Sequence, residues 1–146
     1  MKKILLLIIS TFALLTITGC ANQIQIDNTI ENSNSPEGLT MKLKSLSVDK
    51  AVFTITNNTS KSYYYLLEDS LEKKENNEWK IVPPKEAMSY ADVIETLDAY
   101  SAIEITLDIE FTYGKLSSGT YRFIKKFTNA QEIINAKAEF NVINTY

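Results

Sequence analysis

Apolar and polar residues alternate along most of the chain beyond residue 38, with the period of two that marks half-buried β-strands. The clearest example runs from Ile103 to Phe111, where every second residue is apolar and the residues between them are Glu, Thr or Asp. Further apolar or alternating runs predict six more strands, near residues 39–48, 51–56, 63–71, 79–82, 121–127 and 136–142. Seven strands separated by turn-forming residues favour an all-β, two-sheet sandwich.

Interruptions of these runs predict local features. The alternation of the first strand slips at Ser45, which predicts a β-bulge or a kink. Asn76-Asn77 predicts the turn of a hairpin, and Pro83-Pro84 ends its second strand because proline cannot donate to a ladder. Residues 84–100 fit neither the period of a strand nor that of a helix, so a short helical turn and an irregular crossover both remain open.

The first 20 residues follow a different pattern. Two lysines precede a mostly apolar run from Ile4 to Ile17, which is shorter than the about 20 residues that span a bilayer and is typical of a signal peptide. The run ends in Ile17-Thr18-Gly19-Cys20, which resembles the lipobox of bacterial lipoproteins: an aliphatic residue, two small residues and a cysteine. The resemblance implies cleavage before Cys20 and a diacylglyceryl thioether on its sulfur. An ordinary cysteine behind a conventional cleavage site and an uncleaved anchor are the competing interpretations.

Two acyl chains suffice for stable anchoring, so the expected location is the extracytoplasmic face of the cell membrane, reached through the lipid on Cys20. Residues 21–38 are rich in Asn, Gln and Ser and predict a flexible linker with an average span of about 23 Å. Ile24 and Ile26 alternate and could instead add a short edge strand. The expected organisation is a signal peptide at 1–19, the lipidated cysteine and linker at 20–38, and a β-sandwich domain at 39–146.

Composition excludes several classes of function. The chain has no histidine and one cysteine, so it lacks the commonest general base and metal ligand and can form neither an intrachain disulfide nor a thiolate metal cage. Without the two lysines of the leader, 13 basic side chains face 18 acidic ones, a net charge of −5 with no basic cluster. We therefore expect no enzyme activity, no cofactor or metal, no nucleic-acid partner and no disulfide-linked partner.

Three polar groups could carry chemistry, and each has a simpler interpretation. Ser60-Lys61-Ser62 could pair a serine with a lysine base, but its composition is that of a hydrophilic turn. Glu68-Asp69, or Asp108 with Glu110, could act as paired carboxylates, although acids on the outer face of a strand are usually solvated.

The consecutive residues Tyr63, Tyr64 and Tyr65 form the candidate interaction surface. Adjacent residues of a strand point to opposite faces, so Tyr64 must face away from the other two rings. At least one ring is then expected at the surface, where tyrosine favours recognition. Packing of the rings beneath residues 84–100 is the alternative.

The segment from Tyr113 to Arg122 resembles the approach to the sixth strand of immunoglobulin-like (Ig-like) domains. The resemblance implies a tyrosine corner, in which Leu116 fills the bottom of the core, Gly119 turns the chain and Tyr121 bonds backbone a few residues upstream. Phe123 then stands where antibody domains place their second disulfide cysteine, and Phe53 or Ile55 would face it. An apolar contact would replace the disulfide.

Three short motifs, in this order, are similar to bacterial Ig-like domains of small Gram-positive lipoproteins: Thr56–Thr59, Leu71–Lys74 with Trp79, and Gly119–Arg122. The likeness covers residues 39–143 and implies a seven-stranded Ig-like sandwich without the inter-sheet disulfide. Such domains share no common activity. The expected function is a membrane-anchored, non-catalytic module that binds a protein or cell-envelope partner. An extracellular protease inhibitor that offers residues 83–99 as its loop is the alternative.

Overall fold

The computed structural model describes residues 38–86 and 93–143. They form eight strands and one short helix: β1 (Leu39–Leu46), β2 (Lys50–Asn57), β3 (Tyr63–Glu75), β4 (Glu78–Ile81), β5 (Ile94–Leu97), β6 (Ala102–Asp108), α1 (Ile109–Thr112), β7 (Gly119–Thr128) and β8 (Ile133–Val142). The predicted signal peptide, the lipobox and the linker up to residue 37 lie outside the described residues.

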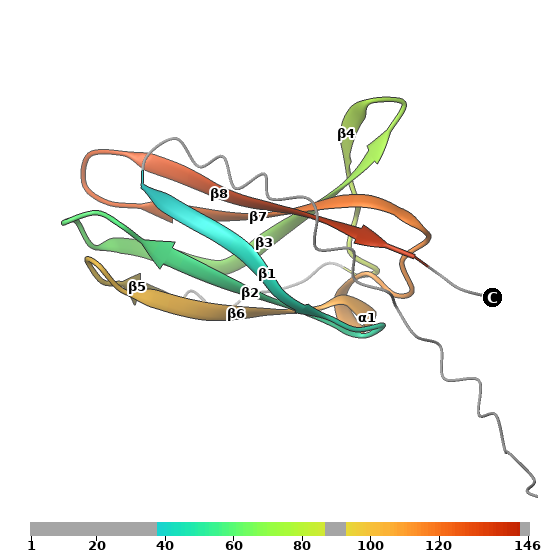
Figure 1. Ribbon diagram of the computed structural model, residues 1–146, viewed down its shortest axis with the longest axis horizontal. Coiled ribbons are helices and arrows are strands. Elements are labelled where there is room, and N and C mark those ends of the chain that lie inside the picture. The colour runs from blue at the N-terminus through green and yellow to red at the C-terminus, as the bar shows by residue number, and fades with distance from the viewer. Residues whose placement is uncertain (1–37, 87–92, 144–146) are drawn as a thin grey trace, which may run out of the picture.

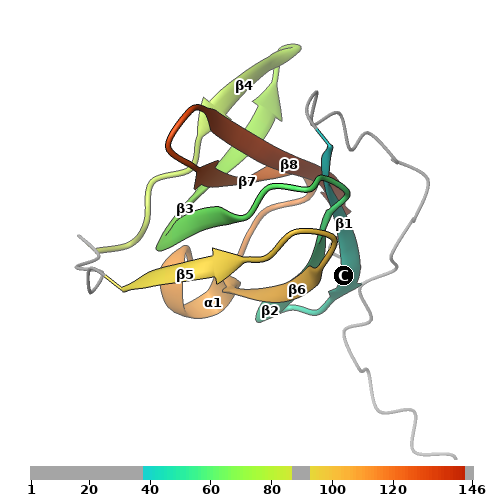
Figure 2. The same cartoon turned by 90° about the vertical axis from the view of Figure 1, so that its left-hand side faces the viewer.

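The strands form two antiparallel sheets that pack as two layers (Figures 1 and 2). One sheet has the order β1-β2-β6, and the other has the order β4-β3-β7-β8, with β5 also paired to β3. This is the all-β sandwich that the sequence predicted, and all seven expected strands are present. The eighth strand, β5, lies in the stretch 84–100, where the sequence indicated no strand. Only Leu97 of β5 is buried, so the strand has no apolar face and forms through its pairing with β3.

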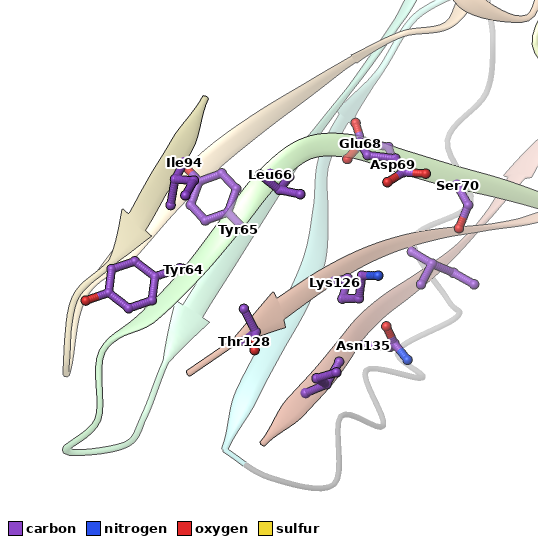
Figure 3. Close-up of a pocket in the computed structure, with 12 residues that line it drawn as sticks. Tyr64, Tyr65, Leu66, Glu68, Asp69, Ser70, Ile94, Lys126, Thr128 and Asn135 are labelled. Atoms are coloured by element: carbon purple, nitrogen blue, oxygen red, sulfur yellow. The ribbon is translucent and has the colours of Figure 1, made fainter. Parts of the chain in front are cut away.

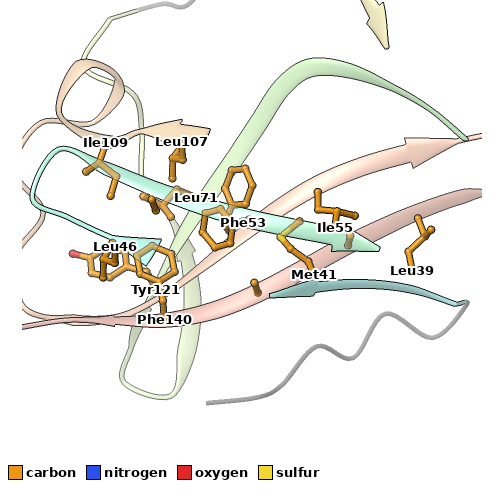
Figure 4. Close-up of a cluster of buried hydrophobic side chains, with 14 of the residues drawn as sticks. Leu39, Met41, Leu46, Phe53, Ile55, Leu71, Leu107, Ile109, Tyr121 and Phe140 are labelled. Atoms are coloured by element: carbon orange, nitrogen blue, oxygen red, sulfur yellow. The ribbon is translucent and has the colours of Figure 1, made fainter. Parts of the chain in front are cut away.

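The core lies between the sheets, and aromatic rings occupy its centre (Figure 4). Phe53 of β2 stacks on Phe123 of β7 with ring centroids 4.5 Å apart and an interplanar angle of 17°. The ring of Phe140 on β8 meets Phe53 edge-on at 5.8 Å. Of the two residues that the sequence left open, Phe53 is therefore the one stacked on Phe123, and an apolar contact joins the sheets where antibody domains have a disulfide.

The first hairpin contains a bulge next to Ser45, where the sequence indicated a bulge or a kink. The pairing of β1 with β2 shifts register between Leu43 and Ser45. A strand exposes alternate residues on opposite faces, so without the extra residue Leu46 would point outward, away from Leu39 and Met41. With the bulge, all three side chains are buried.

The hairpin of β3 and β4 turns at Asn76-Asn77, as predicted. Both residues have positive φ angles, 50° and 69°, which a two-residue type I′ turn requires and which asparagine tolerates better than most residues. The second strand ends at Ile81, before the two prolines.

The strand predicted from Ile103 to Phe111 is shorter than expected. It ends at Asp108, whose carboxylate accepts a hydrogen bond of 3.1 Å from the backbone N–H of Phe111 and caps α1. The Phe111 side chain, expected in the core, is 69% exposed. The alternation hid the change because Ile109 is buried in the helix as it would have been in a strand.

The approach to β7 closes one end of the core. Tyr121 is buried, and its hydroxyl donates a 2.8 Å hydrogen bond to the backbone carbonyl of Ser117, four residues upstream. This is the bond that a tyrosine corner requires. Leu116 is buried at the same end of the core, and Gly119 has a φ angle of 155°, a backbone conformation that residues with a side chain rarely adopt.

We expect Tyr121→Phe to lower the free energy of unfolding by about 1 kcal/mol, because the Ser117 carbonyl loses its donor in a partly buried site. Urea unfolding of the purified protein measures the change. Tyr100→Phe is the matched control, since the Tyr100 ring is 74% exposed and its variant should unfold at the wild-type midpoint. A wild-type midpoint for Tyr121→Phe as well would show that the corner hydrogen bond contributes nothing to stability.

Candidate interaction groove

β3 bulges away from β7 near the middle of the five-stranded sheet. Tyr65 pairs with Phe127 and Asp69 pairs with Lys125, so four steps along β3 match two along β7. The two extra residues must leave the plane of the ladder, and Figure 3 shows β3 curving away from its neighbour between Leu66 and Asp69. We call residues 66–68 the β3 bulge.

The bulge surrounds a buried ammonium group. Lys125 points inward from β7, and its side chain is 2% exposed. Its Nζ donates to Oδ1 of Asp69 at 2.5 Å and to the backbone carbonyl of Glu68 at 3.4 Å, and it lies 5.4 Å from the centroid of the Tyr65 ring. A buried cation is stable only when it is paired and hydrogen-bonded, and the bulge supplies both partners.

The Asp69 carboxylate is also largely removed from water. Burial raises the pKa of Asp69 above its ordinary value, the nearby charge of Glu68 adds to the rise, and the hydrogen bond and charge of Lys125 oppose it. The pair therefore holds β3 and β7 together where their ladder is interrupted.

On the outer face of the same sheet, the bulge leaves a groove of about 630 Å³ (Figure 3). Four of the large apolar side chains that line it are between 43% and 66% exposed: Tyr64, Leu66, Ile94 and Ile133. They come from β3, β5 and β8, and β7 adds Ile124, which lies farther along the groove opposite Ser70 of β3. The groove therefore presents an apolar surface built from four strands.

The three consecutive tyrosines have different environments. Tyr63 is buried, and its hydroxyl donates a 3.0 Å hydrogen bond to Glu132. Tyr65 is partly buried, packs on Phe127 at 5.3 Å between ring centroids, and lies opposite β5. Tyr64 faces away from both and is half-exposed in the groove. Tyr64 is therefore the most exposed ring of the three, while Tyr63 packs inside.

Sequence reasoning missed most of the groove. Leu66, Ile94, Ile124 and Ile133 were not identified as site residues. The sequence did carry one sign of the groove. Ile124 is an apolar residue on the outer face of its strand, the face opposite to that of Phe123 and Lys125, where a polar residue is expected.

The other polar candidates have structural roles in the described residues. Nζ of Lys61 pairs with Glu132 at 2.8 Å, Asp69 pairs with Lys125, and Asp108 caps α1. Residues 38–86 and 93–143 contain no cluster of three or more potential metal-ligating side chains, and none of their helices is long and apolar enough to cross a membrane. The lipobox residues Ile17, Thr18, Gly19 and Cys20 lie outside the described residues.

Comparison with protein-family models assigns residues 23–141 to the bacterial Ig-like domain family. The match covers most of the chain, so the protein belongs to this family. The assignment and the two-sheet topology together confirm the Ig-like sandwich that the sequence motifs implied. A search of curated proteins found none that matches the chain.

We expect Lys125→Met to lower the free energy of unfolding by about 3 kcal/mol at neutral pH, because Asp69 would remain buried without its cation. Folding raises the pKa of Asp69, so its contribution to stability is full below the unfolded pKa and is lost as the pH rises through the folded pKa. Lys125→Met removes the hydrogen bond and charge that oppose this rise, so the folded pKa of Asp69 is higher in the variant and the variant recovers more stability in acid than the wild type does. The cost of Lys125→Met should therefore shrink in acid, which urea unfolding at about pH 4 and about pH 7 would measure.

The double variant Lys125→Met with Asp69→Leu serves as the control, since it removes both charges and should recover much of the loss at neutral pH. If the double variant were as unstable as the single one at both pH values, the ion pair would not be what holds the bulge.

Proposed function

We propose that the protein is a lipoprotein of the extracytoplasmic membrane face whose Ig-like domain binds a protein or cell-envelope partner through the groove. Membership of the family supports a β-sandwich interaction module. Binding through the groove is supported by its apolar lining, because the outer face of an antiparallel sheet is polar when it meets only water.

The anchor rests on sequence features at the amino terminus. The amino terminus has the order that lipoprotein processing requires: two lysines, the apolar run and then Ile17-Thr18-Gly19-Cys20. The one cysteine of the chain is the last residue of this four-residue motif. A thioether-linked diacylglyceryl group would hold the protein on the membrane without a spanning segment.

The apolar side chains Tyr64 and Ile133 lie at the end of the sandwich where the described part of the chain begins. The carbonyl of Gly38 accepts from Asn58 in the turn before β3, and Tyr64 lies at the start of β3. The ion pair of Lys61 with Glu132 brings this turn beside the start of β8, where Ile133 lies. In the proposed arrangement, the apolar end of the groove faces a partner at the membrane surface.

The inhibitor interpretation stays a prediction. Within residues 83–99, β5 is paired to β3, and residues 87–92 lie outside the described residues. No observation in the described part of this segment favours a protease-binding loop over the groove.

We expect Cys20→Ala to release the protein from membranes or to leave its leader uncleaved, because the thioether cannot form. Membrane fractionation and intact-mass measurement of the native protein test this. Thr18→Ala keeps a small residue before the cysteine and should leave processing unchanged. A native protein that retains Met1, or carries an unmodified Cys20 thiol, would end the lipoprotein proposal.

We expect a photo-crosslinking amino acid in place of Tyr64 to form a discrete adduct in intact cells, because the side chain lines the groove. The matched control places the same amino acid at Thr54, which points outward from β2 on the other sheet. Adducts at position 64 and none at position 54 are the expected result. Equal adducts at both positions, or none at position 64, would contradict the groove as the binding site.

A further inference from the structure

The geometry of the groove points to one class of ligand, and we propose that it takes an extended peptide segment of the partner with the pattern apolar-x-acidic-x-apolar. This inference rests on the proposed function and adds the chemistry of the partner to it. It is carried by the order of side chains along β7 and by two lysines beside them that form no ion pair with any other described residue.

One end of the groove is apolar. The ladder places Tyr64, Thr128 and Ile133 side by side across β3, β7 and β8. On the neighbouring strand, Ile94 of β5 lies opposite Leu66. The Thr128 hydroxyl donates to backbone carbonyls of its own turn, so this end offers a ligand apolar contacts.

The middle of the groove carries positive charge. Lys126 lies two residues from Thr128 on the same face of β7 and opposite Asn135. Neither Lys126 nor the nearby outward-facing Lys137 has an ion pair or side-chain hydrogen bond within residues 38–86 and 93–143. Two ammonium groups beside an apolar surface favour a ligand with a carboxylate.

Within residues 38–86 and 93–143, no carboxylate is paired with Lys126 or Lys137. Asp69 lines the groove but is paired with Lys125 beneath it. Glu68 also lines the groove, from the β3 bulge, and opposes an acidic ligand on that side. Lys126 and Lys137 lie on β7 and β8, so an acidic group is favoured on the side of the groove away from the bulge.

The spacing selects an extended chain. Thr128, Lys126 and Ile124 follow one another at every second residue on the outer face of β7. An extended peptide presents alternate side chains on one face with the same repeat, about 6.6 Å. A peptide along β7 therefore places an apolar, an acidic and an apolar side chain over the apolar end, Lys126 and Ile124.

The size of the groove favours a short segment over a second folded domain. Its volume of about 630 Å³ lies within the range of about 300–1,000 Å³ that is usual for small-ligand sites. A stable contact between two folded domains covers roughly 800 Å² on each partner, more than four partly exposed side chains provide.

The test uses the full chain purified in detergent and a fluorescent synthetic peptide, Leu-Ser-Glu-Ser-Leu with glycine–serine ends. Fluorescence polarisation compares it with peptides that carry Gln or Lys in place of Glu. We expect the Glu peptide to bind about tenfold or more tightly than the Lys peptide, with the Gln peptide between them.

Variants of the groove should change binding in a predictable direction. Lys126→Glu should reverse the preference, so that the Lys peptide binds more tightly than the Glu peptide, while the control Lys115→Glu, in the loop before β7, should leave it unchanged. Ile133→Ser should weaken the Glu peptide about tenfold by removing an apolar contact. Ile81→Ser is its control, because Ile81 is 72% exposed on β4 and does not line the groove.

Equal binding of the Glu and Lys peptides, no binding of either, or an unchanged preference in Lys126→Glu would overturn the proposed ligand chemistry. Crosslinking at position 64 separates this failure from a failure of the proposed function. If the peptides fail while position 64 still gives an adduct that position 54 does not, the groove remains the binding site and only the peptide pattern is wrong.

Discussion

The buried ammonium of Lys125 determines the shape of the five-stranded sheet. Strand alternation places this side chain in the core between Phe123 and Phe127, where water cannot solvate it. Its partners come from the neighbouring strand, because β3 departs from the ladder and turns the Asp69 carboxylate and the Glu68 carbonyl toward the charge. The same bulge of β3 leaves the groove on the outer face of the sheet. The internal ion pair and the external groove therefore have one cause, the register shift between β3 and β7.

The sandwich is held across its core by packing instead of a covalent bond. Phe53 and Phe123 stack where antibody domains carry a disulfide, and the only cysteine in the sequence is at position 20, before the first described strand. An apolar contact needs no oxidising compartment to form. The described strands therefore need no cysteine for a disulfide, and the one cysteine of the sequence can serve the proposed lipid attachment, which needs a thiol.

Local rules predicted the strands, the bulge at Ser45 and the Asn76-Asn77 turn, because alternation and turn chemistry are written in neighbouring residues. The helix α1 was missed because Ile109 is buried in either conformation, and β5 was missed because it exists through pairing with a distant strand. The groove depends on a register shift between β3 and β7, which no local pattern encodes. The sequence shows it only indirectly, because two neighbouring residues of β7 depart from the pattern of apolar inner and polar outer positions. Lys125 is on the inner face, and Ile124 is on the outer face.

A short-peptide site is useful only if something raises the local concentration of its ligand, because few contacts give modest affinity. A lipid anchor does this when the partner lies on the same membrane. The linker of 18 residues that the sequence predicts would span about 23 Å on average. A domain anchored as proposed would therefore sample a thin layer above the bilayer and meet membrane-bound partners at high effective concentration. The proposed anchor and the proposed groove are therefore complementary: the anchor raises the occupancy of a weak site, and the groove supplies the specificity that the anchor lacks.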